Sequence, residues 1–393
     1  MEPELSVVMP CLNEARTLES CIRKAQRFFA AAGVSGEIIV ADNGSTDGSP
    51  TLAASLGARV VSVTQRGYGA ALRAGFEAAQ SPLIVMGDSD DSYDFAAMGP
   101  FLERLRAGDD LVVGNRFRGG ISPGAMPWSH RHVGNPLLSL FARLFFRVPL
   151  GDVYCGLRGL NRVAFDRLDL QSLGMEFALE MVVKARLLKM RISEVPTTLA
   201  VDGRDRRPHL DTWRDGRRSL LLYLSIMPGF LFYPGLVLML LGLVFGSILV
   251  ATPVSVFGVV LDIHTLLYCG GCVLLGFQLI AYSVALRFLM IEVKLAPPQN
   301  QFTKWMAAAR LEHGVAVGAA LILAGLGGVW WLIGFWGSDS FGDLDPFQTM
   351  RVAIPSVVGI TLGCQVAFSS LFLSLAVWQV RGRIGPSSPR RPS

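Results

Sequence analysis

The chain has 393 residues, of which 51% are hydrophobic and 17% are charged, with a formal net charge of +5. This composition excludes an entirely soluble protein, because soluble domains carry about 25% charged residues. The apolar excess lies in the second half: no charged residue occurs between Arg218 and Asp262, whereas the part before Arg218 resembles a soluble α/β protein in composition. Basic residues just before this apolar stretch suit anionic lipid headgroups, so we expect a membrane neighbour and no nucleic-acid partner.

Strand-like and helical segments alternate in the first part of the chain. Apolar residues at helical spacing, from Leu18 to Phe29, predict a helix over residues 15–32. Short apolar runs predict strands at residues 5–9, 37–41, 59–63, 83–86 and 111–116. The alternation predicts an α/β domain with a mostly parallel, Rossmann-like sheet.

An acidic cluster, Asp88-Ser89-Asp90-Asp91, directly follows the apolar run at residues 83–87. Ligands of open α/β sheets bind outside the carboxyl ends of the strands. Three carboxylates within four residues repel one another unless they share a cation, and hard oxygen ligands suit Mg²⁺ or Mn²⁺, which usually arrive bound to phosphates. The alternative is a solvated acidic turn.

Other polar residues follow the earlier strands. Glu14, Asp42 and Asp47 stand where a carboxylate commonly binds ribose hydroxyls or a base edge. The alternative for Asp42 and Asp47 is a role in the turn, with Asp47 as the N-cap of the next helix. Gly67-Tyr68-Gly69 opens a helix whose backbone N–H groups can face an anion, although the third glycine of a dinucleotide fingerprint is absent.

Four segments of the second half are long and apolar enough to span a membrane, at about 229–251, 265–286, 315–337 and 353–379. Acidic residues gather after the first and third spans, at Asp262, Asp339, Asp343 and Asp345. Basic residues gather after the second and fourth, at Lys294, Lys304, Arg310, Arg381, Arg383, Arg390 and Arg391. This alternation predicts a multi-pass protein of the cell (inner) membrane with both termini in the cytoplasm.

The N-terminus and the cysteines agree with a cytoplasmic domain. The first predicted strand begins within five residues and no basic segment precedes it, so we expect no cleavable signal peptide. Disulfides are not expected in a reducing compartment. Cys269 and Cys272 have the spacing of a redox motif, but they fall inside a predicted span, where we interpret cysteine as a small packing residue.

Several motifs together carry a family resemblance. Residues 8–14 (Val-Met-Pro-Cys-Leu-Asn-Glu), 42–48 (Asp-Asn-Gly-Ser-Thr-Asp-Gly), 67–72 (Gly-Tyr-Gly-Ala-Ala-Leu) and 88–90 (Asp-Ser-Asp) occur in that order. They resemble the GT-A domain of family 2 glycosyltransferases, over roughly residues 5–225. The stretches at 114–116, 152–159 and 175–180 look like the polyprenyl-phosphate branch, which includes dolichol-phosphate mannose synthases and bacterial undecaprenyl-phosphate sugar transferases.

The resemblance implies a domain organisation and a set of site residues. It implies a GT-A domain at 1–212. Composition and hydropathy add an interfacial helix or plain linker at 213–228, the spans up to 380, and a disordered basic tail at 381–393. The resemblance implies a nucleotide-binding set comprising Pro10, Asn13, Glu14, Asp42, Gly44, Gly67, Gly69 and Asp88. Asp88 and Asp90 would hold the metal, with Asp90 as the more direct ligand. Lipid phosphate would be held by Arg116 and Arg131 with Arg158 nearby, and Arg204 would close over the diphosphate.

Five other positions are open to interpretation. Asn43 stands where many members of the family have a second aspartate. Glu176 is a further candidate site residue, and Glu180 lies four residues before Lys184, a spacing that favours pairing on the helix surface. His130 and His132 are interpreted as loop residues.

The implied function is transfer of a hexose from a UDP- or GDP-linked nucleotide-sugar donor to a polyprenyl phosphate, with inversion and with Mg²⁺ or Mn²⁺. Two alternatives remain. One is a polymer-building membrane synthase, whose usual Gln-x-x-Arg-Trp motif is absent from this chain. The other is a lipid-sugar translocation or partner module with a nucleotide-sugar-binding domain.

Overall fold

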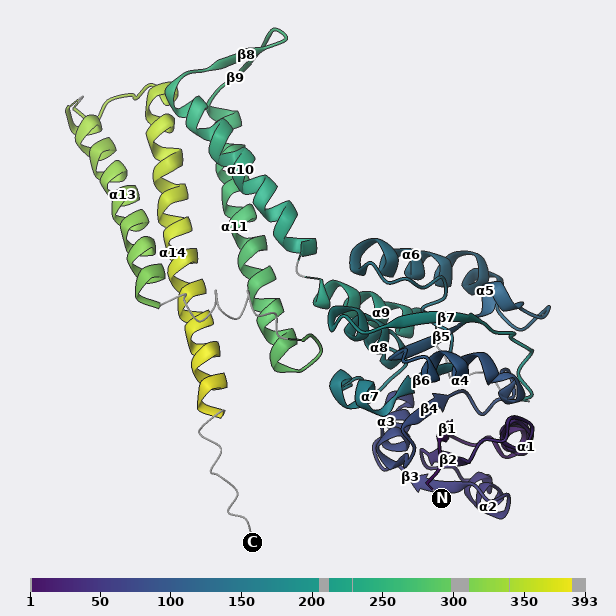
Figure 1. Cartoon of the computed structure of the whole chain (residues 1–393). Coiled ribbons are helices and arrows are strands. Elements are labelled where there is room, and N and C mark those ends of the chain that lie inside the picture. The colour runs from purple at the N-terminus through teal and green to yellow at the C-terminus, as the bar shows by residue number, and fades with distance from the viewer. Residues whose placement is uncertain (1, 205–211, 228, 298–310, 339, 384–393) are drawn as a thin grey trace. The chain divides into compact units, whose positions relative to one another are not determined.

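The computed structural model describes residues 2–204, 212–227, 229–297, 311–338 and 340–383 and comprises two compact units (Figure 1). The first unit contains residues 1–223 and 293–297, and the second contains residues 224–292 and 298–393. Each unit has its own packing.

The first unit is built on a seven-stranded sheet with the order β3-β2-β1-β4-β6-β5-β7. Its strands are β1 (Leu5–Cys11), β2 (Gly36–Asp42), β3 (Arg59–Ser62), β4 (Leu83–Met86), β5 (Leu111–Asn115), β6 (Arg158–Asn161) and β7 (Ile192–Pro196). Strand β6 runs antiparallel to β4 and β5, and every other neighbouring pair is parallel. The predicted α/β class and the five predicted strands are confirmed, whereas β6 and β7 were not predicted.

Helices pack against this sheet and connect its strands. They are α1 (Ala15–Ala32), α2 (Ser49–Ser55), α3 (Tyr68–Ala78), α4 (Gly99–Arg106), α5 (Arg116–Gly119), α6 (Asn135–Phe146), α7 (Arg162–Leu168) and α8 (Phe177–Leu187), with a 3-10 turn η1 (Phe95–Ala97) and a π-helical turn η2 (His130–Gly134). Helix α1 has its predicted bounds because its apolar face, including Leu18, Ile22 and Ala25, is fully buried. Gly33 adopts the left-handed conformation that ends the helix.

The register brings the polar loops to one edge of the sheet. Cys11 pairs with Asp42 across β1 and β2, and Val8 pairs with Met86 across β1 and β4, so these parallel strands end together. Arg158 opens the antiparallel β6 opposite Met86. The loops after β1, β2, β4 and β5 and the loop before β6 therefore meet at the same edge.

The segment before the first span is helical. Helix α9 (Thr212–Ile226) lies between the described end of the sheet domain and α10, and most of its length belongs to the first unit. Tyr223 donates a hydrogen bond to the carbonyl of Leu138 on α6, and its ring contacts Phe141 and Phe146. This end of α9 is therefore fixed to α6.

The second unit consists of four long helices and a short hairpin. The helices are α10 (Gly229–Ala251), α11 (Ile263–Glu292), α13 (Leu311–Ser338) and α14 (Pro346–Arg383), and the hairpin is β8 (Val254–Val256) with β9 (Val259–Leu261). All four helices are long and apolar enough to cross a membrane, which confirms the predicted spans. Helix α14 continues to Arg383, so residues 381–383 are helical and not part of a disordered tail as predicted. The remainder of the predicted tail lies outside the described residues.

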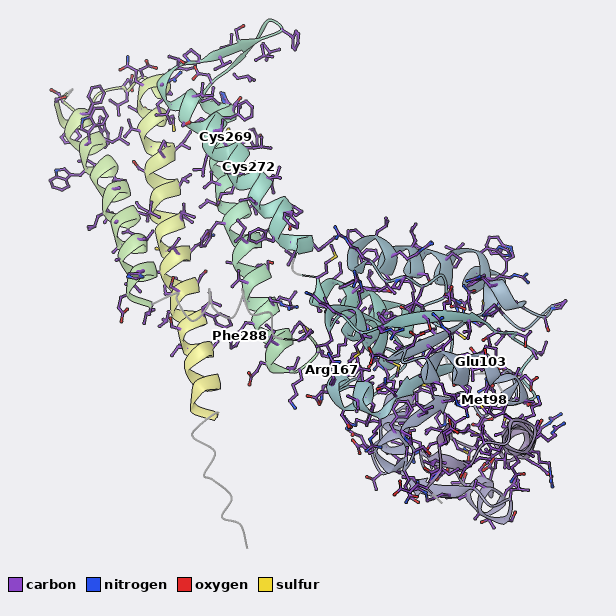
Figure 2. All side chains as sticks on the ribbon, in the orientation of Figure 1. Met98, Glu103, Arg167, Cys269, Cys272 and Phe288 are labelled. Atoms are coloured by element: carbon purple, nitrogen blue, oxygen red, sulfur yellow. The ribbon has the colours of Figure 1, made fainter. Side chains whose placement is uncertain are left out.

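The four helices pack in pairs through small residues. A Cβ atom on Gly242 of α10 would lie 2.5 Å from the carbonyl oxygen of Cys269 on α11. A Cβ atom on Gly318 of α13 would lie 2.7 Å from the carbonyl oxygen of Gly363 on α14. Such close backbone approach is typical of membrane helix pairs. Cys269 and Cys272 are free and lie on the same helix, α11 (Figure 2).

An ion pair joins two of the loops of this unit. Arg351 at the start of α14 pairs with Asp262 before α11 and also donates to the carbonyl of Leu249. The connections after the first and third spans therefore lie at the same end of the helices.

Candidate functional site

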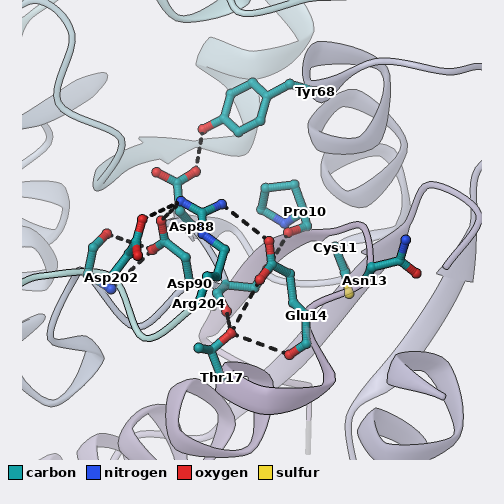
Figure 3. A network of polar contacts seen from close by, with 12 residues as sticks. Pro10, Cys11, Asn13, Glu14, Thr17, Tyr68, Asp88, Asp90, Asp202 and Arg204 are labelled. Atoms are coloured by element: carbon teal, nitrogen blue, oxygen red, sulfur yellow. Dashed lines mark hydrogen bonds and ion pairs between the residues drawn. The ribbon is translucent and has the colours of Figure 1, made fainter. Parts of the chain in front are cut away.

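Two carboxylates form the acidic centre of the site, directly after β4 (Figure 3). Asp88 accepts a hydrogen bond at Oδ1 from the hydroxyl of Tyr68, at 2.9 Å. Asp90 is buried; its Oδ1 accepts from the backbone N–H and the hydroxyl of Ser92, at 3.0 and 2.6 Å. Burial and the neighbouring charge of Asp90 raise the pKa of Asp88 to about 6. A cation between these carboxylates would relieve that repulsion.

The third carboxylate of the cluster turns away. Asp91 adopts a left-handed backbone with φ of 64° and pairs with Lys24 of α1 at 2.8 Å. It also accepts a hydrogen bond from the Ser20 hydroxyl. Asp91 was not among the expected metal ligands, and Lys24 of α1 supplies its counter-charge.

Arg204 lies against the acidic centre. Its Nη2 is 2.8 Å from Asp90 Oδ2 and 3.0 Å from Asp202, and its Nη1 is 3.4 Å from Glu14 (Figure 3). The backbone N–H of Gly203 donates to the carbonyl of Asp90, so the segment before Arg204 is hydrogen-bonded along the acidic loop. Arg204 thus joins Glu14 and Asp90, two of the residues with which it was predicted to share the site.

Two residues of this network were not predicted from the sequence. Asp202 was missed although it lies two residues from Arg204. Thr17 donates from its hydroxyl to the carbonyl of Ser89 at 2.7 Å and so ties α1 to the acidic loop. A signal for Thr17 was available, because it lies one helical turn after Glu14.

The residues expected to bind the nucleotide lie on the loops after β1 and β2. Asp42 accepts hydrogen bonds from the N–H groups of Gly44 and Ser45, at 3.1 and 3.2 Å. Asn13 accepts from the N–H of Thr46 at 2.7 Å, and the Ser89 hydroxyl donates to the carbonyl of Pro10. These contacts hold Pro10, Asn13 and Asp42 at the edge where ligands bind.

Asp47 connects the starts of two helices. Its Oδ1 accepts from the N–H of Ser49 in α2, and its Oδ2 accepts from the N–H of Ala15 in α1. The N-cap position of α2 is Gly48, so the prediction of Asp47 as N-cap was wrong by one residue, although its carboxylate does bind the first turn.

The N–H groups at the start of α3 have partners within the protein. The N–H of Gly67 donates to Asn43 Oδ1 at 2.7 Å, and that of Gly69 donates to the carbonyl of Leu173 at 2.9 Å. A Cβ atom on Gly67 would lie 2.1 Å from the Leu173 oxygen, and one on Gly69 would lie 2.4 Å from the Ser172 oxygen. The structure thus contradicts the anion-binding interpretation of Gly67 and Gly69, whose lack of side chains instead admits the loop at residues 172–173.

The two arginines that were expected to hold the lipid phosphate have different environments. Arg116 makes a buried bidentate pair with Asp152, with Nε–Oδ2 at 2.7 Å and Nη2–Oδ1 at 2.8 Å. Arg131 lies half-buried in η2. Burial and the positive charge of Arg116 lower the pKa of the adjacent His130. The turn that carries Arg131 therefore lies within electrostatic reach of Arg116.

Arg158 has a structural environment. It is fully buried, and its three nitrogens donate to the carbonyls of Cys155, Ala178 and Val153. Arg158 was expected to lie near the lipid phosphate, and in the structure its guanidinium is directed to these backbone carbonyls.

Glu176 and Glu180 differ in the partners of their carboxylates. Glu176 accepts from the N–H of Gly174 through Oε1, while its Oε2 is buried and has no hydrogen-bond partner among the described residues. Glu180 pairs with Lys184 at 2.5 Å, as its spacing indicated. The pair is completely buried, so its predicted place on the helix surface was wrong.

Comparison with known proteins agrees with this architecture. The model of the family "Glycosyl transferase family 2" matches residues 6–169, and that of the "Glycosyltransferase family 2 C-terminal transmembrane region" matches residues 284–377. The low-salt glycan biosynthesis hexosyltransferase Agl6 of Haloferax volcanii is 36% identical over 374 residues, which is 94% of this chain and 88% of that protein. A dolichyl-phosphate hexose transferase of the same organism is 28% identical over 194 residues, 49% of this chain and 81% of that protein.

Solved structures resemble the first part of the chain more loosely. Glucosyl-3-phosphoglycerate synthase from Mycobacterium tuberculosis, in complex with Mn²⁺, UDP and its product, aligns with a TM-score of 0.45 and 24% identity over 56% of this chain and 78% of that one. The family models and the hexosyltransferase relative show that the chain belongs to glycosyltransferase family 2 and is a membrane-spanning member of it.

Proposed function

We propose that this enzyme transfers a hexose from a nucleoside-diphosphate sugar to a polyprenyl phosphate at the cytoplasmic face of the cell membrane, with inversion. The observation that carries the proposal is that one sheet edge brings a two-carboxylate centre and a buried arginine together. The pKa of Asp88 is raised by burial and Asp90, and the positive charges of Arg204 and Arg116 act against that rise, so both arginines lie within electrostatic reach. Such a site suits a reaction between two phosphate-bearing substrates.

A divalent metal fits the donor set of the acidic centre. Asp88 and Asp90 offer hard oxygen ligands, and Mg²⁺ is commonly bound by one or two carboxylates together with substrate phosphates. When bound, Mg²⁺ or Mn²⁺ would neutralise the charge that grows on the leaving diphosphate. Arg204 would add a second positive charge at the same place.

The acceptor needs positioning more than activation. A phosphate monoester has its second pKa at about 6, so it is largely dianionic at neutral pH and is already a nucleophile. Asp152 holds Nε and Nη2 of Arg116 and leaves Nη1 without a hydrogen bond among the described residues. Arg116 would therefore present a fixed donor to the phosphate, and Arg131 would supply a second positive charge. Attack from the face opposite the diphosphate would invert the anomeric centre.

A lipid acceptor is supported by the surface beside Arg131. Helix α6 follows η2 directly and exposes Leu137, Leu140 and Leu144, each by at least 42%. The same helix is fixed through Tyr223 to α9, which precedes the first span along the chain. An apolar surface next to a phosphate-binding arginine suits a substrate with an anionic head and a hydrocarbon chain. The relative named as a dolichyl-phosphate hexose transferase supports the same acceptor class.

The test is a transfer assay with the full chain in detergent. Undecaprenyl phosphate, Mg²⁺ or Mn²⁺ and single UDP- or GDP-hexoses would be incubated with the protein, and the organic phase read by mass spectrometry. We expect one lipid product that is heavier by one hexose. It should be lost with chelator and in Asp90→Asn. It should be retained in the control Asp166→Asn, whose carboxylate is exposed on α7. A ladder of hexose additions would indicate the polymer-building alternative, and absence of any product with bound nucleotide would contradict the proposal.

A further inference from the structure

Tyr68 links the glycine-rich turn to the acidic centre. It is the first residue of α3, between Gly67 and Gly69, and its hydroxyl donates to Asp88 Oδ1 at 2.9 Å (Figure 3). The reaction outlined above gives this hydroxyl no part. The turn was expected to face an anion. In the structure it places the side chain of Tyr68 against Asp88.

The backbone on both sides of Tyr68 is fixed. Gly67 donates to Asn43, and Gly69 donates to the carbonyl of Leu173. Gly67 has φ of +138°, a conformation that side chains rarely adopt, and a Cβ atom there would collide with the Leu173 oxygen. The start of α3 is thus held between the loop after β2 and the loop before α8, which leaves the tyrosine little freedom of position.

The loop before α8 is itself held by the buried Glu180–Lys184 pair. Glu180 accepts from the N–H groups of Gln171 and Ser172, at 2.9 and 2.7 Å. Lys184 donates to the carbonyl of Asp169 at 2.7 Å. A buried ion pair adds little to stability compared with an apolar pair of the same volume. Its effect here is geometric, because it fixes the loop whose Leu173 carbonyl meets the start of α3.

The second oxygen of Asp88 is also constrained. A Cβ atom on Gly156 would lie 2.5 Å from Asp88 Oδ2, so the bare backbone of Gly156 makes room for that oxygen. Tyr68 therefore engages Oδ1, and Gly156 accommodates Oδ2. The two contacts define one orientation of the carboxylate.

We propose that Tyr68 is a positioning residue for metal binding: by holding Asp88 Oδ1 it fixes the orientation in which the Asp88 carboxylate meets the divalent cation. The inference deepens the proposed function and rests on it. Groups that hydrogen-bond to a metal-ligating carboxylate set its orientation, and their loss commonly lowers metal affinity by about 10–100-fold. Tyr68→Phe removes the hydroxyl and keeps the ring, so the fold should persist while Asp88 gains freedom to turn.

The test measures Mn²⁺ binding directly. The full chain in detergent with saturating UDP is titrated with Mn²⁺, and free Mn²⁺ is followed by electron paramagnetic resonance. We expect Tyr68→Phe to weaken Mn²⁺ binding about 10–100-fold. Tyr223→Phe is the matched control, since it also removes one tyrosine hydrogen bond, in this case to the carbonyl of Leu138 on α6, and should leave Mn²⁺ affinity unchanged.

A kinetic measurement separates positioning from general damage. In Tyr68→Phe the Mn²⁺ concentration for half-maximal transfer should rise, while kcat at saturating Mn²⁺ stays close to that of the wild type. Gly156→Ala provides a second route, because its methyl group crowds Oδ2, and it should weaken Mn²⁺ binding as well. Thermal unfolding of each variant verifies that it is folded.

The outcomes distinguish the inference from the function on which it rests. Wild-type Mn²⁺ affinity in a folded Tyr68→Phe variant overturns the role of Tyr68 and leaves the proposed transfer intact. If the wild-type protein transfers hexose equally well with chelator, the metal requirement of the proposed function is wrong. The role of Tyr68 in metal binding is then wrong as well.

Discussion

Arg204 Nη2 lies 2.8 Å from Asp90 Oδ2, so a cation of the chain itself occupies the carboxylate proposed as the more direct metal ligand. The side chain of Arg204 is only 15% exposed, and its guanidinium also contacts Asp202 and Glu14. A divalent ion that binds Asp90 must therefore compete with Arg204 unless the guanidinium moves to another anion. The diphosphate of the donor would be such an anion.

The first prediction concerns this competition. Arg204→Gln should strengthen Mn²⁺ binding in the absence of nucleotide, since the ion pair with Asp90 no longer opposes the metal. The same variant should transfer hexose more slowly, because the diphosphate loses a positive charge. Isothermal titration with Mn²⁺ and the transfer assay measure the two effects. Arg106→Gln is the control, since Arg106 pairs with Glu4 on the surface. Equal Mn²⁺ affinity in Arg204→Gln and wild type would contradict the competition.

The second prediction concerns Arg116. Lysine cannot reproduce the bidentate contact with Asp152. Arg116→Lys should therefore lower kcat/KM for the polyprenyl phosphate by about 10–100-fold. This is the loss expected for a charge-assisted hydrogen bond of about 1.5–3 kcal/mol. UDP binding should be retained, because the nucleotide loops do not include Arg116. Steady-state kinetics with varied acceptor and a UDP titration give the two values. A parallel loss of UDP binding would argue against an acceptor role.

The third prediction concerns the buried pair on α8. Lys184→Met leaves Glu180 as an uncompensated buried charge and should destabilise the first unit by about 3–5 kcal/mol. The double variant Glu180→Gln/Lys184→Met carries no buried charge and should be less destabilised. Thermal unfolding in detergent, followed by circular dichroism, compares them. A double variant that is less stable than Lys184→Met would contradict this prediction. It would show that the Glu180 carboxylate stabilises the fold even without Lys184.

The fourth prediction concerns acid stability. Burial raises the pKa of Glu37, but hydrogen bonds from Ser6, the N–H of Gln80 and Arg59 outweigh it and hold the pKa below its ordinary value. A carboxylate with a lowered pKa stabilises the fold above its unfolded pKa, and this contribution is lost as the pH falls through its folded pKa. Glu37→Gln should therefore reduce stability at neutral pH and flatten its loss in acid. Melting temperatures between pH 7 and pH 3 would reveal this.

A control for the fourth prediction is Glu103→Gln, which changes an exposed carboxylate on α4 (Figure 2). Its melting curve should follow that of the wild type at each pH. The same acid dependence in wild type and Glu37→Gln would assign the loss of stability to other groups.

The elements that the sequence predicted are those with a local pattern. Strand β4 and helix α1 have their predicted bounds because an apolar run and a helical apolar stripe specify them without help from distant residues. Strand β6 has no such pattern. It begins with Arg158, whose charge is tolerated in the interior only because carbonyls from Val153, Cys155 and Ala178 surround it.

In the site, too, the features with a local sequence pattern could be predicted and the long-range contacts could not. The edge of the sheet and its acidic residues could be predicted, because parallel strands end together. The partners of those residues could not. The N–H of Gly69 meets Leu173, which lies more than 100 residues further along the chain, and Asp91 meets Lys24 of α1 through a left-handed turn. Contacts over such separations depend on how the loops pack, which no single motif specifies.

The reversed direction of β6 has a consequence for how this enzyme can diversify. Strand β5 ends and β6 begins at the ligand edge, with Val113 opposite Arg158, so residues 116–157 leave the sheet and return to it at the same place. This excursion carries Arg116, Arg131, Asp152 and the apolar surface of α6, while the acidic centre and the nucleotide loops belong to other strands. Insertions or exchanges within it leave the sheet register untouched. Under the proposed function, recognition of the acceptor can thus change by alteration of one continuous segment, provided that Gly156, which accommodates Asp88 Oδ2, is kept.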